Sequence, residues 1–172
     1  MDRLDTSRRA FLRGRLTPPE PPPIRPPWAK AEPEFTTACT RCQACLPACP
    51  AGILRLANDG YPQVDFSLGE CTFCRACIDA CTHGAFLAPD EARPWNHVAA
   101  VGAGCLGLQG VYCRSCGDVC QPGAISFGFG SRALPIPSID PAACTGCGAC
   151  IAACPAAAIS TVTATSAEDA AT

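Results

Sequence analysis

The sequence predicts a small α+β protein built from two similar units behind an extended N-terminal arm. Three observations support this fold class: cysteines recur in four groups of four, an apolar pair follows each group, and eight prolines crowd into residues 18–33. Aromatic residues make up only 6% of the 172 residues, whereas cysteine contributes 16. A chain so poor in large side chains usually depends on covalent or metal cross-links. This excludes a doubly wound enzyme domain, a coiled coil and a membrane span.

The expected arm covers residues 1–35 and is basic and rich in proline. Residues 1–16 hold five arginines and two aspartates, and the proline run that follows favours an extended backbone. Ser7, Arg8 and Arg9 resemble the start of a twin-arginine export signal. No apolar stretch follows them, so we expect a cytoplasmic location. The net charge of −2 and the mildly acidic body argue against broad nucleic-acid binding.

From residue 39 onward the cysteines form a repeat, which we divide into four sets. Sets one, two and four share the spacing C-x2-C-x2-C-x3-C, whereas set three has seven residues in its first gap. The sets are, in order, Cys39, Cys42, Cys45 and Cys49; Cys71, Cys74, Cys77 and Cys81; Cys105, Cys113, Cys116 and Cys120; and Cys144, Cys147, Cys150 and Cys154.

Short strands are expected between and after the sets. An apolar pair lies four and five residues after the last cysteine of each set, and each pair is expected to begin a strand: Ile53/Leu54, Ala85/Phe86, Ala124/Ile125 and Ala158/Ile159. Residues 58–66 indicate a turn and a strand, and residues 124–139 indicate two strands around a glycine-rich turn. We interpret residues 88–104 as a linker. The expected domains are the arm (1–35), a first unit (36–90), a second unit (91–165) and a flexible tail (166–172).

The spacing within a set is typical of ligands to an iron–sulfur cubane. Three thiolates at i, i+3 and i+6 can hold three corners of one cluster, and the fourth lies one helical turn further on. In two-cluster ferredoxins this fourth cysteine ligates the other cluster. The sequence therefore predicts tandem bacterial-type 2[4Fe-4S] ferredoxin modules, with four clusters in all. Sequential pairing of the sets gives the expected ligands: Cys39, Cys42, Cys45 and Cys81 for cluster 1; Cys71, Cys74, Cys77 and Cys49 for cluster 2; Cys105, Cys113, Cys116 and Cys154 for cluster 3; and Cys144, Cys147, Cys150 and Cys120 for cluster 4.

Other interpretations of the cysteines are less well supported. Interleaved pairing, set one with set four and set two with set three, is compatible with the spacing. A disulfide scaffold needs an oxidising compartment. A tetrahedral zinc site takes two cysteines from each loop rather than three in a row. We recognise no nucleophile–base pair and no phosphate loop, so an enzyme with a substrate of its own is not expected.

Three sequence features resemble the NapF-type ferredoxins encoded with periplasmic nitrate reductases. These are Ser7-Arg8-Arg9 followed by Gly14-Arg15, the segment Ile24-Arg25-Pro26-Pro27-Trp28, and the long first gap of set three, which closes at Cys113-Arg114-Ser115-Cys116. The resemblance implies a cytoplasmic accessory protein with four [4Fe-4S] clusters. Such a protein binds the molybdenum-containing catalytic subunit of the nitrate reductase and assists its maturation before export. The alternative is an electron-transfer ferredoxin that passes single electrons to a redox partner.

Overall fold

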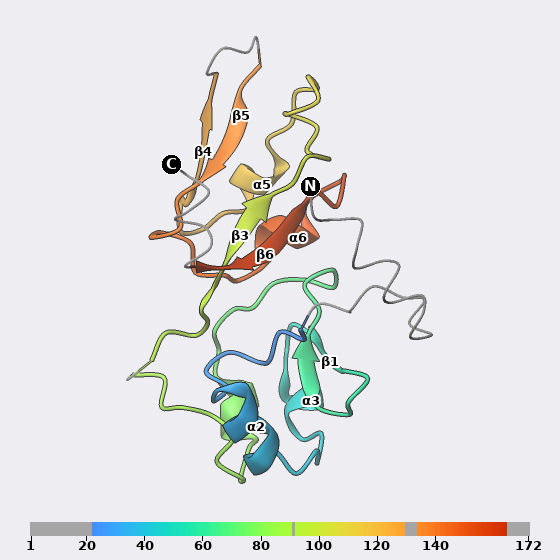
Figure 1. Ribbon diagram of the computed structural model, residues 1–172, viewed down its shortest axis with the longest axis vertical. Helices are drawn as coiled ribbons and strands as arrows, with labels where there is room; N and C mark the ends of the chain where they lie inside the picture. Colours follow the sequence, from blue (N-terminus) through green and yellow to red (C-terminus); the bar gives the residue numbers. More distant parts are fainter. Residues whose placement is uncertain (1–21, 91, 130–133, 165–172) are drawn as a thin grey trace, which may run out of the picture.

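The computed structural model describes residues 22–90, 92–129 and 134–164 and shows two small units joined by one crossing segment (Figure 1). The first unit contains α2 (Glu32–Ala38), α3 (Cys45–Ala48), β1 (Leu54–Leu56), β2 (Pro62–Val64) and α4 (Ala76–Asp79). The second contains β3 (His97–Val101), α5 (Ser115–Asp118), β4 (Ile125–Gly128), β5 (Ile136–Ile139), α6 (Ala149–Ala152) and β6 (Ile159–Thr163). The mixed α+β class is confirmed. No helix in these three ranges is long and apolar enough to cross a membrane.

In the described part of the chain, three antiparallel pairs of strands make up the sheets. β1 pairs with β2, with Leu54 opposite Val64, and β4 pairs with β5, with Ile125 opposite Ile139. These are strands that the sequence predicts. β3 pairs with β6, with Val101 opposite Ile159. β3 lies inside residues 88–104, so the interpretation of that whole segment as a linker is wrong: Val98 is buried, and strand β3 places it there.

The first unit closes in the same way, although by a shorter contact. Lys30 donates its backbone N–H to the Ala85 carbonyl, Leu87 donates to the Trp28 carbonyl, and Ala29 forms an isolated antiparallel bridge with Phe86. The second apolar pair thus begins a bridge rather than a full strand. Pro26 and Pro27, which precede the bridge, have no N–H to donate, which limits the pairing on that side.

The expected arm therefore ends earlier than residue 35. Trp28 is 5% exposed and Phe35 is 1% exposed, so both belong to the packed first unit. Residues 32–38 are helical rather than extended: Pro33 stands in the first turn, where its missing N–H costs nothing, and Glu32 and Glu34 favour the helix N-terminus. The basic segment 1–16 and the tail 166–172 lie outside the described residues.

Backbone hydrogen bonds show that the two units repeat one local structure. Asp65 donates to the Ile53 carbonyl in the first unit, and Asp140 donates to the Ala124 carbonyl in the second, both at 2.8 Å. After the last cysteine of sets one and three, a glycine three residues on closes the same turn onto that cysteine. The repeat seen in the cysteine spacing is therefore a repeat of the fold.

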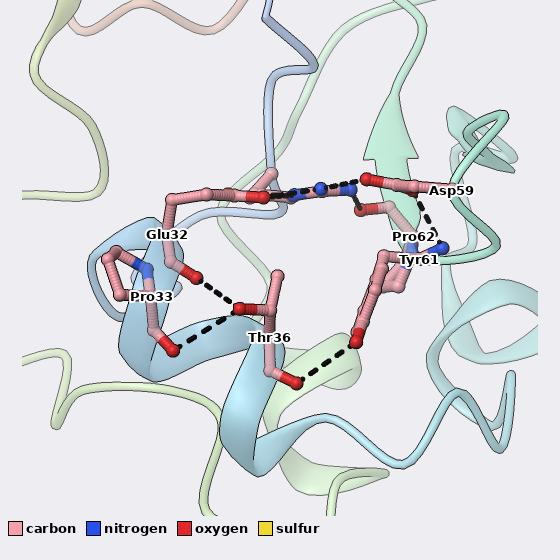
Figure 2. Close-up of polar contacts among 7 residues, drawn as sticks. Glu32, Pro33, Thr36, Asp59, Tyr61 and Pro62 are labelled. Carbon is pink, nitrogen blue, oxygen red and sulfur yellow. Dashed lines mark hydrogen bonds and ion pairs between the residues drawn. The ribbon is translucent and has the colours of Figure 1, made fainter.

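A buried arginine ties the entry of the first unit to its hairpin. Arg25 donates from Nε and Nη2 to Glu32 and from Nη2 to Asp59, with both shortest N–O distances at 2.6 Å, and from Nη1 to the Pro62 carbonyl. Figure 2 shows Glu32 and Asp59 at opposite ends of this network. The guanidinium carbon also lies 5.4 Å from the ring centroids of Phe35 and Tyr61.

The charges of this network support one another. Burial alone would lower the pKa of Arg25, but its hydrogen bonds and ion pairs with Glu32 and Asp59 outweigh that effect and raise it. The hydrogen bond from Arg25 lowers the pKa of Asp59. Because that carboxyl has its pKa depressed in the folded state, its small contribution to stability is present above its ordinary pKa and is lost as the pH falls through the lowered value.

We expect Arg25→Lys to destabilise the first unit by about 2 kcal/mol, because an ammonium cannot serve three acceptors in the plane of a guanidinium. The thermal midpoint of the anaerobically purified protein, followed by circular dichroism, should fall by about 5 °C. The matched control is Arg55→Lys on β1, where the side chain is exposed. Equal midpoints for the two variants would show that the network is dispensable.

Candidate metal centres

Three cavities are each lined by four cysteines, three from one set and the last from a neighbouring set. Cys39, Cys42, Cys45 and Cys81 line the first cavity. Cys71, Cys74, Cys77 and Cys49 line the second. Cys144, Cys147, Cys150 and Cys120 line the third. These groupings are the ones that sequential pairing predicts for clusters 1, 2 and 4.

The cysteines of set three lie less close together because seven residues separate the first two of them. Cys105 and Cys113 lie close enough to Cys116 to affect its thiol electrostatically. Cys154 packs against the same buried cluster that contains Cys116. The intervening loop folds back on itself through the hydrogen bond from Val111 to the Leu106 carbonyl. The structure thus brings Cys105 and Cys113 near Cys116 and places Cys154 against the core cluster that contains Cys116.

The third cysteine of every set is the buried one. Cys45, Cys77, Cys116 and Cys150 are 8–9% exposed, while Cys42 and Cys74, the second cysteines of sets one and two, are exposed. The short helix of each set carries this third cysteine and points it into the core of its unit. Each set therefore has one sulfur inward, and sets one and two have another toward the surface.

Left-handed backbone conformations flank the second cysteine of sets one, two and four. The pairs are Arg41 and Gln43 (φ 59° and 65°), Phe73 and Arg75 (φ 55° and 67°), and Gly146 and Gly148 (φ 74° and 84°). Alternating right- and left-handed residues turn successive N–H groups toward a common concavity, a geometry found at many anion and iron–sulfur sites. Four of these six residues are not glycine and accept the strain that such sites commonly store.

Set three lacks this feature. Neither Tyr112 nor Arg114, which flank Cys113, has a positive φ. The Arg114 guanidinium instead lies 4.5 Å from the centroid of the Phe127 ring. An added Cβ at Gly117 would collide with that same ring, so glycine is required at this position. The inserted residues change how the loop wraps its sulfurs.

Backbone N–H groups also contact the sulfurs directly. Phe73 donates to Cys71 Sγ at 3.4 Å, and Ala158 donates to Cys154 Sγ at 3.3 Å. Hydrogen bonds of this kind stabilise negative charge on a sulfur ligand and tune an iron–sulfur centre. The loops are thus built to surround thiolates rather than neutral thiols.

The thiols need a positively charged partner to ionise. Burial raises the pKa of Cys77 and Cys150 to about 12 and that of Cys45 and Cys71 to about 11, and neighbouring cysteines add to each shift. A buried, uncompensated thiolate is therefore unfavourable at neutral pH. Iron ions would supply the compensating charge, and binding them would release the thiol protons.

The arrangement fits a multi-iron group better than disulfides or zinc. All 16 cysteines are free, which contradicts a disulfide scaffold. Within the described part of the chain, no group of three or more histidine, cysteine or acidic side chains is placed to hold a single metal ion. The sulfurs instead surround a space: Cys144, Cys147, Cys150 and Cys120 together line one cavity. Spacing of ligands around a volume is what a cubane requires.

The sequence signals these sites unevenly. The cysteine spacing defines the four sets but leaves sequential and interleaved pairing open, and the glycines of set four indicate left-handed backbone. Arg41, Gln43, Phe73 and Arg75 gave no such signal, because nothing in their side chains favours a positive φ. His83 lines the same cavity as set one, a position that its sequence context did not reveal.

Comparison with known proteins identifies the domains. A family model described as a 4Fe-4S dicluster domain matches residues 38–85 and 111–158. Cys105 lies outside the second match, in keeping with the long first gap of set three. The ferredoxin-type protein NapF of Escherichia coli (strain K12) is 43% identical over 157 residues, which cover 91% of this chain and 94% of the relative.

Other relatives extend this result. The ferredoxin-type protein NapF of Haemophilus influenzae is 46% identical over 138 residues, covering 79% of this chain and 77% of that protein. A methylamine utilization ferredoxin-type protein, MauM of Methylophilus methylotrophus, is 38% identical over 144 residues, covering 74% of this chain and 64% of that protein. No solved structure matches the chain.

Cys49→Ser tests the pairing of the sets. Since Cys49 lines the cavity of set two, we expect its loss to expose Cys71, Cys74 and Cys77 to alkylation by iodoacetamide under anaerobic conditions. Cys144, Cys147 and Cys150 should stay protected. Mass spectrometry of tryptic peptides measures both groups. Interleaved pairing gives the opposite result, with the set-four cysteines becoming reactive.

Proposed function

The chain belongs to the NapF family of ferredoxin-type proteins, and from this premise we propose that it is a four-cluster accessory protein for a periplasmic nitrate reductase. In this proposal it binds the molybdenum-containing catalytic subunit in the cytoplasm and assists its maturation before export. The observation that carries the proposal is the grouping of 16 free cysteines into neighbouring sets of four, of which all but Cys105 lie within the two matched dicluster domains.

We assign the ligands of the four clusters by sequential pairing. The lining of three cavities supports clusters 1, 2 and 4, and the surroundings of Cys116 support cluster 3. When bound, such clusters supply one-electron transfer. The chain contributes the thiolates, the N–H groups that face them and the apolar surroundings that exclude water. Its proposed role needs no substrate of its own.

Charge separation along the chain supports a docking role for the N-terminus. Residues 39–154 carry six basic and eight acidic side chains, to which thiolate-ligated clusters would add further negative charge. Five of the 13 basic residues lie in residues 1–16. A basic segment tethered to an acidic body suits recognition of an acidic surface on a partner better than it suits a freely diffusing carrier.

Electron transfer is the second candidate function, and the packing inside each unit favours it. Cys45 and Cys77 lie in one buried cluster of the first unit, and Cys116 and Cys150 lie in one of the second. In each unit the two proposed clusters are thus neighbours, which suits exchange of single electrons. The reduction potentials that such sites reach span a range of roughly −700 to +450 mV.

We expect the anaerobically purified protein to contain about 16 iron and about 16 sulfide per chain, as four [4Fe-4S] clusters require. Iron and acid-labile sulfide are measured by colorimetric assay on the same sample, with zinc measured by mass spectrometry. A protein that contains zinc and no sulfide would overturn the proposed function at its base.

Docking is tested by replacing Arg3, Arg8, Arg9, Arg13 and Arg15 with glutamine. We expect co-purification with the catalytic subunit of the nitrate reductase to fall at least about tenfold, while the iron content stays unchanged, because steering by charge is lost. Deletion through residue 30 is unsuitable, since it removes the buried Arg25 and Trp28. The matched control replaces Arg55 and Arg93, which belong to the body. Undiminished binding of the five-arginine variant would exclude a docking role for this segment.

A further inference from the structure

The two units contact one another through the loops of sets two and four. The backbone N–H of Cys71 donates to the carbonyl oxygen of Cys147 at 2.9 Å. Cys71 lines the second cavity and Cys147 lines the third. This hydrogen bond therefore joins two proposed cluster sites that belong to different dicluster domains.

Close packing accompanies the hydrogen bond. An added Cβ at Gly148 would collide with the ring of Phe66, which is 5% exposed, so the glycine allows the set-four loop to lie directly on the first unit. Ile151 of α6 packs against the buried cluster that contains Phe66. In Figure 1, α6 lies on the side of the second unit that faces the first.

Aromatic side chains pack beside the contact between the two units. The Phe66 ring meets Trp95 and His97 at centroid distances of 5.7 and 5.8 Å. His97 lies in turn against set four, where its Nε2 is 3.0 Å from the Gly146 carbonyl oxygen. Trp95 donates its Nε1–H to the Arg25 carbonyl. The segment that crosses between the units is thus fixed to both of them.

We propose that Phe66, Cys71, Cys147 and Gly148 form an electron-transfer junction that places the sites of sets two and four side by side. The sites then follow one another in the order one, two, four, three, which differs from their order in the sequence. An electron entering beside the exposed Cys42 leaves beside Cys113, at the loop where Tyr112 is 63% exposed. This inference rests on the proposed function, because it requires clusters at the four sites.

Each exchange along this route balances simply. One electron leaves a reduced site and enters its oxidised neighbour, no bond forms or breaks, and no proton moves. The first electron comes from an external one-electron reductant of low potential, and dithionite serves in the experiment. Because the rate of electron tunnelling falls steeply with distance, contact between the units is what allows electrons to pass from one dicluster domain to the other.

The experiment isolates the two inner sites. In the full chain, Cys42→Ser and Cys113→Ser together should remove the outer clusters and leave about eight iron per chain. After reduction with dithionite, the electron paramagnetic resonance spectrum should show broadening by spin–spin interaction between the sites of sets two and four. Adding Gly148→Ala should separate the units and give two narrow, non-interacting signals.

The control is Gly123→Ala in the same background. Gly123 also has a left-handed backbone (φ +68°), but no atom lies within 4 Å of an added Cβ. It reproduces the backbone strain without the collision, so the interaction should persist. Phe66→Leu, which lies outside the cysteine loops, provides a second test and should weaken the interaction with iron unchanged.

The outcomes separate the inference from the proposed function. Eight iron with non-interacting signals before Gly148→Ala is added would overturn the junction and leave the clusters in place. The same holds if the interaction survives both Gly148→Ala and Phe66→Leu. Absence of iron and sulfide from the unsubstituted protein would instead overturn the proposed function itself.

Discussion

Burial of one thiol from each cysteine set is the constraint on which the rest of the structure depends. Cys45, Cys77, Cys116 and Cys150 occupy core positions that large apolar side chains fill in most small domains. Burial raises the pKa of each of these thiols, so the core is complete only with a cofactor that binds thiolates and carries positive charge. The scarcity of aromatic residues follows from this arrangement.

The loops that bury these thiols contain strained backbone conformations. Residues of three sets adopt left-handed conformations on both sides of the second cysteine, and most of them are not glycine. Such strain persists where the surrounding structure determines it. Here the determinants are short helices that point one sulfur inward and strands that close each unit around its sets.

Contact between the units determines whether the two dicluster domains are independent or joined. Two dicluster domains in tandem could be independent carriers on one chain. The hydrogen bond from Cys71 to Cys147 and the packing of Phe66 on Gly148 instead join set two to set four. If the proposed junction connects all four proposed clusters, an accessory protein that delivers electrons to a partner would need only one docking site.

The sequence by itself determined the repeat, the ligand types and five of the strands, because cysteine spacing and apolar pairs act over a few residues. The interpretation of residues 88–104 as a linker was wrong at residues 97–101. There β3 forms because it pairs with β6, which lies more than fifty residues further along the chain. The expected arm extended too far along the sequence for the same reason. Burial of Trp28 depends on the carbonyl oxygens of Ala92 and Pro94, which accept hydrogen bonds from its ring and backbone N–H groups. Tertiary structure alone decided which sets face each other across the units, since that depends on one glycine meeting one ring from a distant loop.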